Sequence, residues 1–77
     1  MNNLTLLQDL YNAAFSGNIE KVTRITERLI NKGVSYRVQN KVLQLAHVSC
    51  NIESVVTTIK GIVEEDKLLT VRVPSLN

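Results

Sequence analysis

The feature that most constrains the fold is a short pattern that occurs twice in the chain. Residues 17–22 read GNIEKV and residues 50–55 read CNIESV, so Asn18 and Asn51 hold equivalent positions. When residues 10–30 are aligned with residues 43–63, seven of the 21 positions are identical. The identical pairs are Leu10/Leu43, Ala13/Ala46, Ser16/Ser49, Asn18/Asn51, Ile19/Ile52, Glu20/Glu53 and Val22/Val55.

The interval from Asn18 to Asn51 is the repeat period of the chain. A period of roughly 33 residues is typical of stacked helical hairpins, in which each repeat is one pair of helices. The matches also lie where a hairpin needs them, with a small residue in the first helix, a tight turn and then the inner face of the second helix. The chain is therefore predicted to contain two helical hairpins.

Local signals place four helices within these two units. In four segments, apolar residues recur at steps of three and four, which is the period of an amphipathic helix. The first segment starts near Leu4, the second covers residues 19–31, the third follows Ser35 and the fourth follows Asn51. Asn18 and Ser35 are of the residue types that cap helix N-termini, so each is predicted to precede a helix.

The two hairpins and the segment after them make up one small domain. We predict an all-α domain over residues 1–77, formed by two stacked αα-hairpins at 4–32 and 35–64. Residues 67–77 are predicted to be a short extended tail, either a strand or a frayed end, because apolar and polar residues alternate there. The apolar residues of this alternation are Leu69, Val71 and Val73.

The composition limits the chemistry that the chain can perform. One cysteine, Cys50, rules out an internal disulfide, and together with the single histidine, His47, it supplies too few ligands for a zinc site. No acidic residue lies near His47 in the sequence, and three glycines form no phosphate-binding loop. The chain is therefore predicted to be non-enzymatic, with no metal and no cofactor.

Charge and hydropathy indicate a folded, cytoplasmic protein. A hydrophobic fraction of 44% and a net charge of +2 are typical of a globular chain. No apolar run approaches the roughly 18 residues that cross a bilayer, and the first residues lack the regions of a signal peptide. A single cysteine suits a reducing compartment. We expect a cytoplasmic protein with no membrane partner.

The hairpin pattern resembles a degenerate pair of tetratricopeptide repeats covering residues 4–64. Key positions of the first repeat hold Leu6, Leu10, Ala13, Gly17, Val22 and Leu29, and those of the second hold Val42, Leu43, Ala46, Cys50, Val55, Ile59 and Ile62. The family prefers alanine where Val22 and Val55 stand, and its early tryptophan is absent. The segment AAFSGNIEKV also resembles the middle of an ankyrin repeat, although the helix after it is about a turn too long.

The run TERLINKGVSYRVQNKVLQLAHVSCNIESVV, residues 26–56, is similar in rhythm to small chaperones of type III secretion. These chaperones hold the needle subunit before export. The resemblance implies a cytoplasmic adaptor that binds an aggregation-prone secreted subunit, often beside a second small chaperone. A compact inhibitor of a larger enzyme is an alternative that the sequence does not separate from an adaptor.

The first predicted helix is apolar on two sides, and only one side is needed to pack on the second helix. The other side carries Leu4, Leu7, Tyr11 and Ala14. We predict that these four residues, with Gln44 and His47 opposite them, form a groove for an amphipathic helix of a partner protein. The alternative is that this side packs against the third and fourth helices or the tail. A homodimer formed through the first helix would also cover it.

The second predicted helix carries a stripe of positive charge. Lys21, Arg24, Arg28 and Lys32 recur at helical spacing and share one face, and Arg37 and Lys41 follow. Such a face is typical of contacts with phosphates or an acidic protein, so a small nucleic-acid-associated regulator is the alternative function. The simpler interpretation is a solvated outer face, because the net charge is low and no aromatic residue is interleaved for base stacking.

Overall fold

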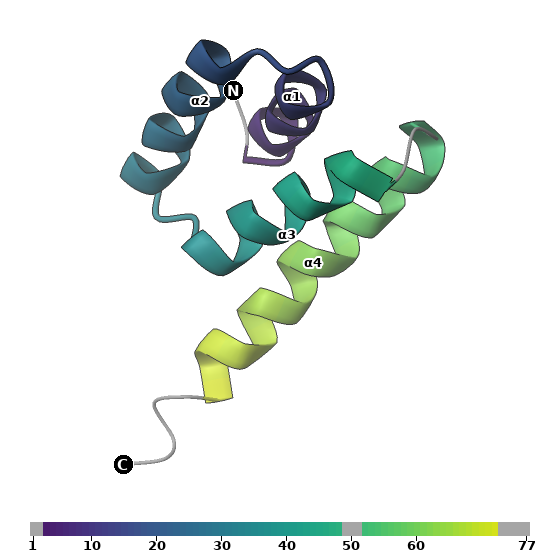
Figure 1. Ribbon diagram of the computed structural model, residues 1–77. Helices are drawn as coiled ribbons and strands as arrows, with labels where there is room; N and C mark the ends of the chain where they lie inside the picture. The colour runs from purple at the N-terminus through teal and green to yellow at the C-terminus, as the bar shows by residue number, and fades with distance from the viewer. Residues whose placement is uncertain (1–2, 49–51, 73–77) are drawn as a thin grey trace.

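Four helices make up the described part of the chain, which is residues 3–48 and 52–72 of a computed structural model (Figure 1). They are α1 (Asn3–Phe15), α2 (Ile19–Asn31), α3 (Tyr36–Val48) and α4 (Ile52–Arg72). Helices α1 and α2 form one hairpin, α3 and α4 form the other, and α1 packs against α3. Within the described ranges there is no strand. The predicted all-α fold of two stacked αα-hairpins is confirmed.

The repeat period reappears in the bounds of the helices. Helix α3 begins and ends one period after α1, and α4 begins one period after α2. The end of α4 breaks the repeat. Whereas α2 ends at Asn31, α4 continues past the equivalent position, Glu64, and ends at Arg72. We call these added residues, 65–72, the α4 extension.

Short-range contacts explain where α2 and α3 start. The Asn18 side chain accepts a hydrogen bond from the Lys21 backbone N–H over 3.1 Å, which is the N-cap contact that the sequence predicts. Ser35 Oγ accepts one from the Val38 N–H over 3.3 Å and caps α3 in the same way. Gly33, with φ of +82°, supplies the left-handed turn after α2.

The core is centred on α1, which contacts each of the other three helices. Side chains that are fully buried come from every helix: Leu7, Leu10, Leu29, Val42 and Ile59. Full burial of such a side chain contributes about 1.5–3 kcal/mol of transfer free energy. Because all three neighbours pack on α1, most of its apolar side chains are buried; Phe15, at its end, is 59% exposed.

The prediction of an extended tail from residue 67 is wrong for residues 67–72. These residues are helical, so Leu69 and Val71 lie within α4. Each residue added to an existing helix gains a backbone hydrogen bond, and the preceding turn is anchored to α3 by Glu65 and Asp66. The rest of the predicted tail, including Val73, lies outside the described residues.

Candidate protein-binding site

The groove predicted on α1 is not an open surface. Leu7 has none of its surface exposed and Tyr11 has only 3% exposed. Tyr11 shares a small hollow with Val55 and Val56 of α4. Leu7 lies beside Val38 of α3 and Val63 of α4, so the second hairpin covers this side of α1. The prediction is therefore wrong for Leu7 and Tyr11, and the alternative of packing against the second hairpin is confirmed for them. Ala14 is half-buried against the same core.

Gln44 and His47, predicted to lie opposite the α1 residues, are exposed on α3 and do not join them. The repeat explains this difference. Gln44 lies one period after Tyr11 and His47 lies one period after Ala14, so they hold equivalent positions in the two hairpins. In the first hairpin these positions are covered by the second hairpin and hold apolar residues. In the second hairpin the same positions are uncovered and hold polar residues, as is usual for the last unit of a stacked array.

Leu4, the remaining member of the predicted set, is half-buried and borders a hollow of about 480 Å³ between α1 and α4. The residues that line it are Asn3, Leu4, Lys60, Val63, Glu64 and Lys67. A second hollow, of about 130 Å³, shares Asn3, Val63 and Lys67 with it and continues toward the start of α3. Its other lining residues are Leu7, Gly33, Val34, Val38 and Asp66. We call the two together the Leu4–Val63 groove. Its floor is apolar and its rim is charged.

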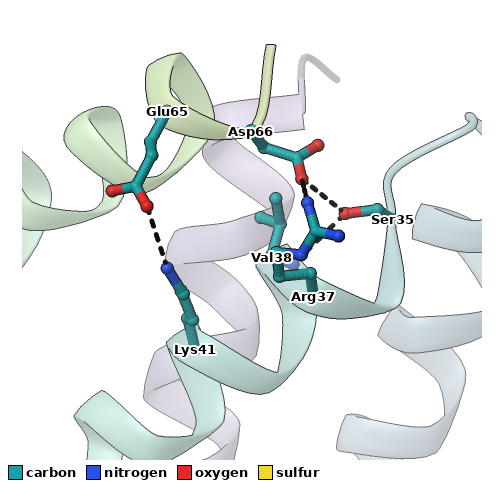
Figure 2. A network of polar contacts seen from close by, with 6 residues as sticks. All are labelled: Ser35, Arg37, Val38, Lys41, Glu65 and Asp66. Atoms are coloured by element: carbon teal, nitrogen blue, oxygen red, sulfur yellow. Dashed lines mark hydrogen bonds and ion pairs between the residues drawn. The ribbon is translucent and has the colours of Figure 1, made fainter. Parts of the chain in front are cut away.

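Contacts between α3 and the α4 extension position this groove (Figure 2). Asp66 Oδ1 accepts hydrogen bonds from Ser35 Oγ over 3.1 Å and from Arg37 over 3.3 Å. Lys41 forms an ion pair with Glu65 over 3.4 Å. These contacts fix the second half of α4 against the start of α3, and Lys67, next to Asp66 in the sequence, then borders the groove.

The charged rim has one internal ion pair and one cation without such a pair. Lys67 and Glu64 approach to 3.6 Å, and both side chains are largely exposed. Lys60 is exposed and forms no ion pair with any other described residue. The first turn of α1, which starts at Asn3 on the rim, contains no acidic residue. Around the larger hollow, Lys60 and Lys67 thus face a single acidic residue, Glu64, and this part of the rim is positive. At the smaller hollow, Asp66 is paired with Arg37.

The sequence pattern does not predict that Lys60, Val63 and Lys67 border one site. The helical period places Val63 on the inner face of the fourth helix, and the alternation after residue 66 predicts a tail. A signal is nevertheless present in the adjacent apolar pair Ile62 and Val63, which makes the apolar stripe of α4 wider than one packing partner requires.

The predicted basic stripe lies on the outer face of α2, away from the groove. All four of its residues are exposed, and Ile25 and Leu29 of the same helix point into the core. Arg24 forms an ion pair with Glu20 over 3.1 Å, one helical turn away. Arg37 and Lys41 do not extend the stripe, because their side chains pair with Asp66 and Glu65 of α4.

Among the residues with a described placement, no three histidine, cysteine or acidic side chains come close enough together to hold a metal ion. Cys50 lies outside them. His47 is exposed. The helices of the described ranges also include none with the length and apolar character needed to cross a membrane.

Comparisons with known proteins identify no relative of this chain. Neither protein-family models, nor curated proteins, nor solved structures contain a match to this chain. The assignment of function therefore depends on the residues of the chain and on their geometry.

Proposed function

We propose that this chain is a non-enzymatic protein-binding adaptor that holds an amphipathic helix of another protein in the Leu4–Val63 groove. The supporting observation is the groove itself, where apolar side chains of α1 and α4 stay accessible inside a charged rim. Most of the remaining apolar surface of α1 is buried by the other helices. An apolar floor with a few polar groups at its edge is the usual composition of a binding site.

The dimensions of the groove suit a helix. Its larger hollow, about 480 Å³, is within the range of ligand sites and has room for a few apolar side chains. An amphipathic helix presents such side chains at i, i+3, i+4 and i+7 on one face. Docking would bury the floor residues Leu4 and Val63, which are now half-exposed, and leave the rim at the edge of the interface.

The specific form of this proposal is a cytoplasmic chaperone-like adaptor of type III secretion. It would hold a helix of a secreted subunit, with or without a second small chaperone. Its support is the resemblance of residues 26–56 to those chaperones, although the chain is shorter than is usual for them. A secreted subunit whose amphipathic helix is exposed before assembly would supply the apolar side chains that the groove accepts.

A second candidate function, binding of nucleic acid, has one observation in its favour. The four stripe residues of α2 are exposed, and of these only Arg24 has an ion pair with another described residue. A protein that neutralises phosphates releases counterions, so its affinity falls steeply as salt is added. Binding to mixed-sequence DNA that is weak at low salt, or that does not change with salt, would exclude this function.

Photo-crosslinking in the native host tests the adaptor proposal. A photoreactive amino acid replaces Lys60 on the groove rim in one strain and Thr23, exposed on α2, in a matched control strain. We expect one or two protein adducts from position 60 that survive nuclease, that are absent from position 23, and that weaken when Leu4→Ala is added. Equal adducts at both positions, no adduct at position 60, or adducts lost on nuclease treatment would contradict the proposal.

A further inference from the structure

We infer that the helix held in the Leu4–Val63 groove is acidic along the edge that faces Lys60 and Lys67. This inference rests on the function proposed above and specifies the chemistry of the partner. It follows from how α4 distributes its charges between the groove and α3.

The three consecutive acidic residues 64–66 of α4 make their ion pairs with different helices. Glu65 and Asp66 are directed to α3, where they pair with Lys41 and Arg37 (Figure 2). Of the three consecutive acidic residues 64–66, only Glu64 lines the larger hollow. Asp66 also borders the smaller hollow, but Arg37 neutralises its charge there. Around the larger hollow, the cations Lys60 and Lys67 face only Glu64, so positive charge is in excess.

The pair between Lys67 and Glu64 does not prevent Lys67 from binding a partner. The two side chains are 68% and 71% exposed, and they approach only to 3.6 Å. An exposed pair of this kind contributes little to stability, so a carboxylate of the partner can replace Glu64 at small cost. Lys60 has no ion pair to break among the described residues.

The spacing of the cations specifies the pattern expected in the partner. Lys60 and Lys67 are two helical turns apart on α4 and therefore share a face, about 10 Å apart along its axis. A partner helix lying along α4 would match them with carboxylates at i and i+7 beside its apolar stripe. The start of α1 at Asn3 adds the positive end of a helix dipole to the same rim.

Two synthetic peptides test the inference on the full chain. Each is an amphipathic helix of ~18 residues, or about five turns, with the same leucine stripe. One carries glutamates and the other carries lysines at two positions, i and i+7, that flank the stripe. Affinity is measured by calorimetry, and the bound surface is located by NMR shifts of the ¹⁵N-labelled protein. We expect the acidic peptide to bind about tenfold more tightly, with shifts at Leu4 and Val63.

Charge variants of the protein identify the residues responsible. Lys60→Glu with Lys67→Glu should invert the preference, and Lys60→Gln with Lys67→Gln should bring the two affinities close together. The matched control, Lys21→Glu with Arg28→Glu on α2, makes the same change in net charge and should leave the ratio unaltered. Circular dichroism of each variant confirms that it is folded.

The outcomes separate the inference from the function on which it rests. Equal binding of both peptides in the groove, or tighter binding of the basic peptide, would overturn the acidic edge and leave the groove as a binding site. Tighter binding of the acidic peptide with NMR shifts on α2 instead of at Leu4 would also overturn the inference. No binding of either peptide would overturn both the inference and the proposed function.

Discussion

Ser35, immediately before α3, donates a hydrogen bond from Oγ to Asp66 Oδ1 of α4 over 3.1 Å, across 31 positions of sequence. The same Ser35 Oγ accepts the Val38 N–H, so the N-terminal cap of α3 is coupled to a carboxylate on another helix. Asp66 has only 18% of its side chain exposed and also accepts a bond from Arg37. The α4 extension therefore stabilises the start of α3.

Asp66→Ala should lower the free energy of unfolding by about 1–3 kcal/mol, because it leaves Ser35 and Arg37 without their shared acceptor. Urea denaturation followed by circular dichroism measures the loss. The matched control is Glu65→Ala on the same helix, where the pair with Lys41 is more exposed and is worth at most about 1 kcal/mol. Equal losses in the two variants would show that Asp66 has no special role.

Leu7→Ala should lower the free energy of unfolding by about 2–5 kcal/mol, since it opens a cavity at a fully buried position. If the Leu7 side chain were instead exposed to solvent, its truncation would leave stability almost unchanged. Leu68→Ala on α4 is the control, because 65% of Leu68 is exposed and its truncation should have little effect. A loss below about 0.5 kcal/mol for Leu7→Ala would contradict the described core.

Replacement of Gly61 and of Gly33 by alanine should change the stability of the fold in opposite directions. Gly61 lies within α4, and a Cβ added there meets no neighbouring atom, so Gly61→Ala should stabilise the fold by about 0.5–1 kcal/mol. Gly33 has φ of +82°, a conformation that costs an alanine about 1–2 kcal/mol. Thermal unfolding of the two variants should therefore shift in opposite directions. A lower melting temperature for Gly61→Ala would contradict the regular helix at this position.

Replacing all four stripe residues of α2 by glutamine should leave stability within about 0.5 kcal/mol of the parent, because all four are exposed. The proposed function also predicts that crosslinking from position 60 continues in this variant. Loss of those adducts, with the fold intact, would show that the stripe contributes to partner binding. If nucleic acid is the partner, the slope of log K for DNA binding against log salt concentration should become shallower by about three to four in this variant.

Features that depend on neighbouring residues in the sequence could be predicted. The starts of α2 and α3 follow from Asn18 and Ser35, whose side chains bond to backbone groups three residues ahead. The repeat period likewise indicated how the helices pair into hairpins. These signals can be read from one sequence, because each cap is local and the repeat is a comparison of the chain with itself.

Features that depend on distant residues could not be predicted. The period of α1 shows that Leu7 and Tyr11 form an apolar side, but it does not say which element covers that side. The alternation after Lys67 favoured an extended tail, whereas contacts of Asp66 with Ser35 and Arg37, far away in the sequence, favour helix. The groove was missed for the same reason, because it requires Leu4 and Val63 from the first and last helices.

Some residues of the first hairpin and of its connection to α3 complete their contacts only when α4, the last helix to be synthesised, is present. On the ribosome, the first hairpin is complete long before residues 65–72 emerge, yet Tyr11 borders α4 and Ser35 bonds to Asp66. Until α4 is made, Tyr11 lacks its neighbours Val55 and Val56, and the cap of α3 lacks the Asp66 carboxylate. Part of the apolar side of α1 therefore becomes buried only when the last helix is synthesised, and such transiently exposed apolar surface favours aggregation.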